Sequence, residues 1–268
     1  MKRPIINFNQ EWTEASDDLL HALSPGVIRG HGVFETILID HGHVCLWQEH
    51  FDRLKRGCGL YKIQFTFSSI KLLQQIKKIV QLNHLIHGRV RISIYKDQGQ
   101  IFFNIVGVPL NSKKDSIKVM ISPIRRKKNA FSHVKSITYE PYFEANKEAK
   151  SKGYDEAILL NPSGFLVEGS TTNIFMVEKN LLLTPSIDTG CLNGIIRQKV
   201  IGLARQAGIK VKTGKYKLNR LVKADEVFLT NSLIGLKPVS CVNQFRFLKK
   251  PRPVFDLLLD LYKKSPQY

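Results

Sequence analysis

The chain has 268 residues, of which 43% are hydrophobic and 24% are charged. This length can bury one large core or two moderate ones, and the composition excludes a fibrous or disordered protein. The formal net charge of +19 is compatible with polyanionic partners. However, the basic run 125–128 lies among turn residues with no aromatic ladder, so a solvated basic surface is the preferred interpretation.

No apolar stretch approaches the roughly 20 residues that a membrane helix needs. No long apolar run follows the N-terminal Met1-Lys2-Arg3, as it would in a secretory signal. The cysteines are scattered, without C-x-x-C or other metal-ligand spacing, at Cys45, Cys58, Cys191 and Cys241. We therefore expect free thiols in a cytoplasmic protein that has no metal site and no membrane segment.

The first third of the chain mixes strand-like and helix-like segments. Residues 32–39 and 44–47 are predicted strands, and residues 69–85 form a predicted helix after a Ser-Ser pair that could cap it. Residues 89–95 alternate between apolar and polar side chains. This alternation predicts a half-buried strand with Arg91 on its polar face.

A polar segment at 109–115 is the best candidate for a linker. The elements predicted after it are a strand at 117–121, a helix at 141–152, two strands around a glycine turn within 156–176, a helix at 194–206 and a strand at 226–230. The regular βαβ repeat of a Rossmann fold is absent. We predict an α+β protein with a smaller N-terminal domain (1–110), a linker (111–115) and a larger C-terminal domain (116–268).

Two segments suggest binding chemistry from their residues alone. The amphipathic helix at 194–206 is entered through Asn193-Gly194, and the free N–H groups of such a helix start can bind an anion. A glycine at a helix start is common, however. Glu168 interrupts an apolar run, so its carboxylate needs a cation or donor, which could be a surface lysine or arginine or the protonated ring nitrogen of a cofactor.

Lys135 and Arg53 are not marked as functional by spacing alone, because the chain has 41 basic residues. Taken with their neighbours and in order, however, several segments resemble the class IV aminotransferases, the pyridoxal phosphate (PLP) enzymes that include aminodeoxychorismate lyase. The matching stretches are RGHGVFETI (29–37), HFDRL (50–54), KSITY (135–139), DEAILLNPSGFLVEGSTTNIF (155–175), NGIIRQ (193–198) and ADEVFLTNSLIGLKPV (224–239). No single motif is decisive, but the ordered set is specific.

The resemblance implies a fold-type IV PLP enzyme with a small α/β domain and a larger, barrel-like mixed β domain. It assigns Lys135 as the Schiff-base lysine and Glu168 as the carboxylate that pairs with the pyridine nitrogen. The phosphate-binding positions that it implies are Arg53, the backbone N–H groups of Ile195 and Ile196, and Ser232, and Asn173 matches a position beside the cofactor. Lys135 would also serve as the general base, and Glu168 would favour the protonated ring by charge pairing.

Within the family we favour 4-amino-4-deoxychorismate lyase, which releases pyruvate and 4-aminobenzoate for folate synthesis, over a branched-chain or D-amino-acid aminotransferase. The motifs NGIIRQ and RGHGVFET resemble the lyase forms. A substrate with two carboxylates would suit Arg29 and Arg91, although a surface or inter-subunit ion pair is an equal alternative for each arginine. The segment after residue 95 departs from the pattern of many relatives, which leaves specificity open there.

The resemblance also implies a homodimer, because relatives build the active site near a subunit interface. A third hypothesis, nucleic-acid binding, is suggested only by the net charge. It would require salt-sensitive binding. No basic-aromatic module supports it.

Overall fold

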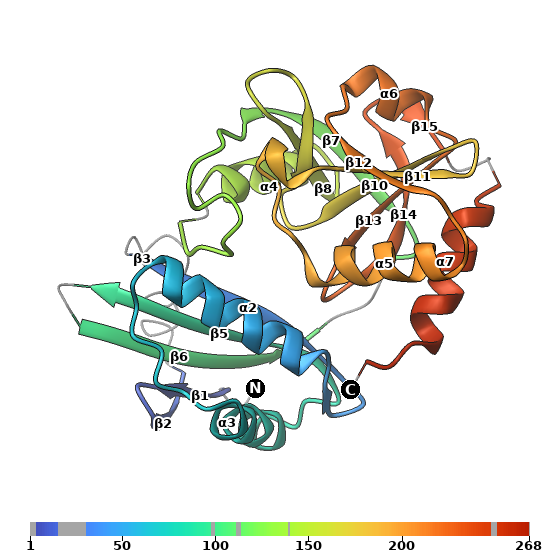
Figure 1. Cartoon of the computed structure of the whole chain (residues 1–268). Coiled ribbons are helices and arrows are strands. Elements are labelled where there is room, and N and C mark those ends of the chain that lie inside the picture. Colours follow the sequence, from blue (N-terminus) through green and yellow to red (C-terminus); the bar gives the residue numbers. More distant parts are fainter. Residues whose placement is uncertain are drawn as a thin grey trace. The chain divides into compact units, whose positions relative to one another are not determined.

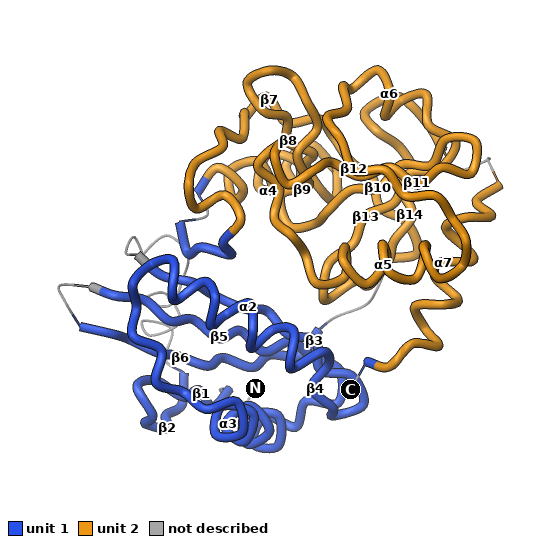
Figure 2. The backbone as a smooth tube through the Cα atoms, in the orientation of Figure 1, with its two compact units in different colours: residues 1–112, 134–140, 267–268 blue, residues 113–133, 141–266 orange. Residues whose placement is uncertain are grey.

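The computed structural model describes residues 4–15, 31–97, 100–110, 114–138, 140–247 and 251–267. The chain divides into two compact units (Figure 2). Unit 1 comprises residues 1–112, 134–140 and 267–268, and unit 2 comprises residues 113–133 and 141–266. The division differs from the predicted domains at 134–140, a segment that the sequence interpretation placed in the C-terminal domain. Of the predicted linker, residues 111–113 lie outside the described residues.

Unit 1 is built on an antiparallel sheet that carries two helices (Figure 1). Its strands follow the order β2-β1-β6-β5-β3-β4 in the described part of the chain. The strands are β1 (Ile5–Phe8), β2 (Glu11–Glu14), β3 (His31–Asp40), β4 (His43–Val44), β5 (His87–Asp97) and β6 (Gln100–Pro109), and the helices are α2 (Trp47–Leu60) and α3 (Ser69–Leu82).

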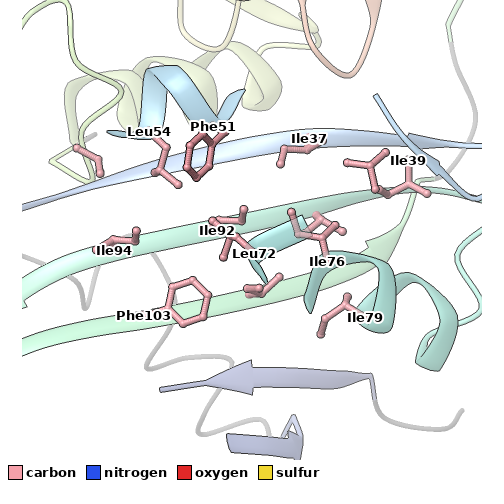
Figure 3. Packing of buried hydrophobic residues seen from close by; sticks show 14 of the residues in the cluster. Ile37, Ile39, Phe51, Leu54, Leu72, Ile76, Ile79, Ile92, Ile94 and Phe103 are labelled. Atoms are coloured by element: carbon pink, nitrogen blue, oxygen red, sulfur yellow. The ribbon is translucent and has the colours of Figure 1, made fainter. Parts of the chain in front are cut away.

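The core of unit 1 lies between the sheet and these two helices (Figure 3). Alternate residues of β5, Val90, Ile92 and Ile94, are fully buried there, as the sequence alternation predicts. They pack with α2 and α3 side chains such as Leu54 and Ile76. The opposite face of β5 carries Arg91, because side chains alternate across a strand.

Unit 2 contains a larger mixed sheet with helices outside it (Figure 1). The strand order is β12-β11-β10-β13-β14-β7-β8-β9, and β15 pairs with β14. The strands are β7 (Ile117–Arg125), β8 (Glu156–Leu160), β9 (Leu166–Gly169), β10 (Asn173–Glu178), β11 (Leu181–Pro185), β12 (Val211–Gly214), β13 (Glu226–Asn231), β14 (Gly235–Val242) and β15 (Phe245–Arg246). The helices are α4 (Glu140–Ser151), the 3-10 turn η1 (Ile187–Thr189), α5 (Ile195–Gln206), α6 (Leu218–Lys223) and α7 (Pro253–Lys264).

Alternate residues of β10 face two different packing regions. Ile174 and Met176 belong to the apolar core of the sheet. Phe175 stacks on Phe228 of β13, with ring centroids 5.0 Å apart, and Phe228 packs against Phe255 of α7. Asn173, at the start of β10, therefore lies on the Phe175 side of the strand.

The predicted α+β class is confirmed, and most predicted elements occur within a few residues of their expected bounds. The predicted strand at 44–47 is wrong, because β4 ends at Val44 and α2 begins at Trp47. Leu46, with φ 50°, makes the turn between them. The predicted cap of the next helix is confirmed, since the Ser68 hydroxyl accepts a hydrogen bond from the backbone N–H of Lys71. None of the described helices is long and apolar enough to span a membrane.

Candidate active site

Lys135 is held in unit 1 by pairing of its segment with the start of β3. The backbone N–H of Phe34 donates to the Lys135 carbonyl at 2.9 Å, and the N–H of Ile137 donates to the Gly32 carbonyl at 3.0 Å. The Tyr61 hydroxyl forms a hydrogen bond with the Ser136 hydroxyl at 2.7 Å. These contacts explain why 134–140 belongs to unit 1 although it is distant from β3 in sequence.

Phe34 brings two cationic side chains of unit 1 together. The Lys135 amine lies 4.4 Å from the centre of the Phe34 ring, and the Arg91 guanidinium lies 3.9 Å from it. Phe34 itself is buried. The Phe34 ring therefore lies close to both an amine and a guanidinium in this part of unit 1.

The Arg53 side chain of α2 pairs with a buried carboxylate that the sequence interpretation missed. Arg53 donates from Nε and Nη2 to the two carboxylate oxygens of Glu35, at 2.6 and 2.7 Å. His50 Nδ1 lies 2.7 Å from the same carboxylate. Glu35 stands among the core-facing positions of β3, between Val33 and Ile37, and this break in the apolar alternation is the signal that could have identified it.

The environment of this cluster perturbs two pKa values. Burial alone would raise the pKa of Glu35, but the adjacent Arg53 guanidinium and His50 together hold it at about 2. Burial lowers the pKa of His50 more than the Glu35 carboxylate raises it, and the positive charges of Arg53 and Lys135 lower it further. Glu35 is therefore an anion that neutralises Arg53, and Lys135 lies near enough to His50 to affect its charge.

Glu168 is the penultimate residue of β9 in unit 2 and is buried among hydrogen-bond donors. Its Oε1 accepts a hydrogen bond from the Tyr142 hydroxyl at 2.6 Å. Its Oε2 accepts from the backbone N–H of Leu192 at 2.9 Å and from Asn173 Nδ2 at 3.3 Å. Burial of a carboxylate is costly, and these donors compensate for the lost water.

Asn173 links Glu168 to the N-terminus of α5. Its Nδ2 also donates to the Leu192 carbonyl at 2.9 Å, two residues before the N-cap, Gly194. A Cβ atom at Gly194 would lie 2.0 Å from Asn173 Oδ1, so glycine is required here for close approach rather than for its backbone angle. Of the sequence candidates, Glu168, Asn173 and the residues that begin α5 are thus brought together.

The first turn of α5 contains Ile195 and Ile196, and no side chain caps it. Arg197 in the same turn is buried; it donates from Nη1 to Asn193 Oδ1 at 2.9 Å and from Nη2 to the Pro185 carbonyl at 3.0 Å. These bonds fix the chain as it enters the helix. Uncapped N–H groups at a fixed helix start are suited to an anion such as phosphate.

Ser232 lies in the turn between β13 and β14. The Asn231 side-chain oxygen accepts the backbone N–H groups of Leu233 and Ile234, both at 2.9 Å, which fixes the turn. Asn231 Nδ2 donates to the Thr171 carbonyl at 3.1 Å, so this turn is tied to the loop that follows β9. Arg29, the other predicted substrate residue, lies outside the described residues.

The predicted site residues therefore form two groups, one in each unit. Unit 1 brings Lys135, Arg91 and Arg53 to the strand pair β3–β5 and helix α2. Unit 2 brings Glu168 and Asn173 to the start of α5. Sequence interpretation missed Tyr142, Glu35, His50 and Arg197, all of which bond or lie close to a predicted residue.

Comparison with known proteins identifies the family. The family model described as amino-transferase class IV matches residues 32–242. The chain belongs to the class IV aminotransferase family. This family is PLP-dependent, and its members carry out either lyase or aminotransferase reactions.

Class IV relatives of both types are similar to this chain over most of its length. Aminodeoxychorismate lyase of Bacillus subtilis is 28% identical, with 97% of this chain and 94% of that protein covered. A putative branched-chain-amino-acid aminotransferase of Methanocaldococcus jannaschii is 29% identical, with coverages of 87% and 86%. The crystal structure of the Escherichia coli branched-chain aminotransferase has a TM-score of 0.86 at 25% identity and covers 97% of this chain and 93% of its own.

The residues of this class IV chain fit the family's cofactor by their chemistry. The α5 start offers uncapped N–H groups, and Gly194 keeps the space beside Asn173 that a Cβ would fill. Glu168 is a buried acid that accepts hydrogen bonds from three donors in the described part of the chain, and such a carboxylate is suited to face a protonated ring nitrogen. Lys135 carries a primary amine, the group with which such an aldehyde cofactor condenses.

Proposed function

We propose that this protein is a PLP-dependent 4-amino-4-deoxychorismate lyase that releases pyruvate and forms 4-aminobenzoate. The observation that carries the proposal is the similarity to the Bacillus subtilis lyase along nearly the whole of both chains. The reaction would serve folate synthesis in the cytoplasm, and the enzyme would act as a homodimer on an anionic small molecule, with nucleic acid not a partner.

The proposed cofactor ligands are the residues that the family resemblance assigns. Lys135 would hold PLP covalently and act as the general base. Arg53, the N–H groups of Ile195 and Ile196, and Ser232 would bind its phosphate. Glu168, supported by Asn173, would face the ring nitrogen. When bound, the cofactor would supply an electron sink for the negative charge that proton removal leaves on the substrate.

The position of Arg91 favours an anionic substrate. Its guanidinium and the Lys135 amine contact the same buried ring of Phe34, so a carboxylate held by Arg91 would orient a substrate near the proposed base. Arg29 is proposed for a second carboxylate on the basis of the family resemblance. Proton transfer by Lys135 and orientation by Arg91 would be common to a lyase and an aminotransferase.

The second candidate is a branched-chain or D-amino-acid aminotransferase of the same family. It is favoured by the similarity to the Methanocaldococcus jannaschii protein and by the TM-score with the Escherichia coli enzyme. Because both reactions use the same cofactor apparatus, residues around the substrate decide between them.

The experiment has two stages. Purified protein is supplied with PLP, its visible spectrum is recorded, and borohydride reduction followed by peptide mapping locates the modified lysine. We expect labelling at Lys135 and its loss in Lys135→Ala, with Lys127→Ala as a control at an exposed lysine. A protein that stays colourless, or a label elsewhere, would contradict the proposed cofactor site.

The second stage identifies the reaction of the loaded protein. It is incubated with enzymatically made aminodeoxychorismate, and 4-aminobenzoate is followed by fluorescence. Product formation that is lost in Lys135→Ala supports the lyase. If no product forms but a branched-chain or D-amino acid abolishes the visible band, the aminotransferase is the function instead.

A further inference from the structure

Among the described hydrogen bonds to Glu168, that of Tyr142 is the shortest. Its hydroxyl donates to Glu168 Oε1 at 2.6 Å, whereas the Leu192 N–H and Asn173 Nδ2 lie 2.9 and 3.3 Å from Oε2. Tyr142 and Glu168 are 7% and 5% exposed. The bond therefore joins two side chains from which water is nearly excluded, one on α4 and one on β9.

A short bond of this kind stabilises the negative charge of the acceptor. Hydrogen bonds from a hydroxyl to an ionised carboxylate are typically about 2.5–2.7 Å long and stronger than those between neutral groups. Donors to the charged form favour that form over the protonated acid. Among the donors described for Glu168, only the tyrosine hydroxyl can be removed without altering the backbone at Leu192 or the hydrogen bonds of Asn173.

The aromatic ring of Tyr142 lies close to a cation. The Arg126 guanidinium lies 5.1 Å from the centre of the Tyr142 ring. A cation near an aromatic ring is attracted by its electrons, and a nearby positive charge favours negative charge on the phenol oxygen. Arg126 therefore makes the Tyr142 hydroxyl a stronger donor toward Glu168.

We propose that Tyr142 is a positioning residue that keeps Glu168 ionised, so that the proton shared between this carboxylate and the cofactor's ring nitrogen stays on the nitrogen. The inference rests on the proposed function, because it requires PLP to bind with its ring nitrogen at Glu168. Tyr142 need not touch the reacting atoms. Loss of its hydroxyl would make Glu168 a stronger proton acceptor and leave the ring nitrogen less protonated, which weakens the electron sink.

The chain offers a matched pair of variants. Tyr142→Phe removes the hydroxyl and keeps the buried ring. Tyr216→Phe is the control, because Tyr216 is also a buried residue of unit 2 whose hydroxyl donates a hydrogen bond, to the Lys212 carbonyl at 2.9 Å. Neither variant alters Lys135 or the residues proposed to bind phosphate.

The test uses the PLP-loaded full-length protein with cofactor labelled by ¹⁵N in the ring. Nitrogen NMR distinguishes a protonated from a neutral ring nitrogen without any turnover. We expect the wild-type and Tyr216→Phe signals to be those of the protonated form at pH 7. The Tyr142→Phe signal should move toward the neutral form, and kcat should fall by about tenfold with KM changed by less than about twofold.

An unchanged ¹⁵N signal for Tyr142→Phe between pH 6 and 9 would overturn the inference, whatever happens to activity. If Tyr142→Phe does not fold, Arg126→Gln provides the test instead. This variant should shift the ¹⁵N signal in the same direction by a smaller amount, and an unchanged signal would contradict the inference. A wild-type protein that fails to bind PLP at Lys135 would instead refute the proposed function, so the two failures are distinguishable.

Discussion

Glu35 and Arg53 form a two-point ion pair between β3 and α2, with Nε–Oε1 and Nη2–Oε2 distances of 2.6 and 2.7 Å. The pair uses one edge of the guanidinium. Among the described residues, Arg53 Nη1 has no hydrogen-bond partner. Glu35 therefore fixes the orientation of Arg53 while leaving this nitrogen for the proposed phosphate contact.

The pair predicts a pH dependence of folding stability. The pKa of Glu35 is lowered from 4.5 to about 2 in the folded protein. Its contribution to the free energy of unfolding is therefore fully present above pH 4.5 and is lost as the pH falls toward 2. At about 1.4 kcal/mol per pKa unit, the ionised carboxylate contributes roughly 3 kcal/mol. The free energy of unfolding, measured by urea denaturation, should be higher for wild type than for Glu35→Gln at pH 6. This difference should become smaller as the pH is lowered to 3.5.

Asp40→Asn is the control for Glu35→Gln. Asp40 contacts His87, and both side chains are about one-third exposed, so this pair should contribute at most about 1 kcal/mol. A stability difference between wild type and Glu35→Gln that stays constant over the whole pH range would contradict the role assigned to the Glu35 carboxylate.

The close approach of Gly194 to Asn173 predicts that a larger residue at position 194 weakens PLP binding. In Gly194→Ala the new Cβ would meet Asn173 Oδ1 at 2.0 Å, so Asn173 must move and lose its bonds to Leu192 and Glu168. We expect the Kd for PLP, measured by absorbance titration, to rise by about tenfold or more.

Gly202→Ala tests whether any alanine in α5 has this effect. Gly202 lies in the same helix, and no atom of the described residues lies within 4 Å of an added Cβ. Alanine at position 202 should leave the Kd for PLP unchanged and raise the free energy of unfolding by up to about 1 kcal/mol. Equal PLP affinities of the two variants would argue against the close contact between Gly194 and Asn173.

The buried cysteines predict slow thiol chemistry. Burial raises the pKa of Cys58 to about 12. Burial and then the negative charge of Glu168 raise the pKa of Cys191 to about 12 as well. Since the thiolate is the reactive form, a disulfide reagent at pH 8 should label Cys241 first, which is partly exposed. Peptide mapping after brief labelling checks the order, and denatured protein should react at all four cysteines.

Local sequence patterns determined much of the fold. Apolar alternation in β5 predicted which side chains would be buried, because a strand places successive residues on opposite faces. Helical periodicity and the Ser68 cap predicted α3 for the same kind of local reason. Short elements were less predictable: the 44–47 segment has strand-like residues, yet Leu46 adopts a left-handed conformation and α2 starts at Trp47.

The ordered motifs determined the family and the candidate residues, since their types and order along the chain can be read without coordinates. Only the tertiary structure paired Glu35 with Arg53, attached 134–140 to β3, and brought Tyr142 to Glu168 across 26 residues of sequence. Such pairings depend on which elements pack together and how a buried charge is compensated. No periodicity within one segment contains that information.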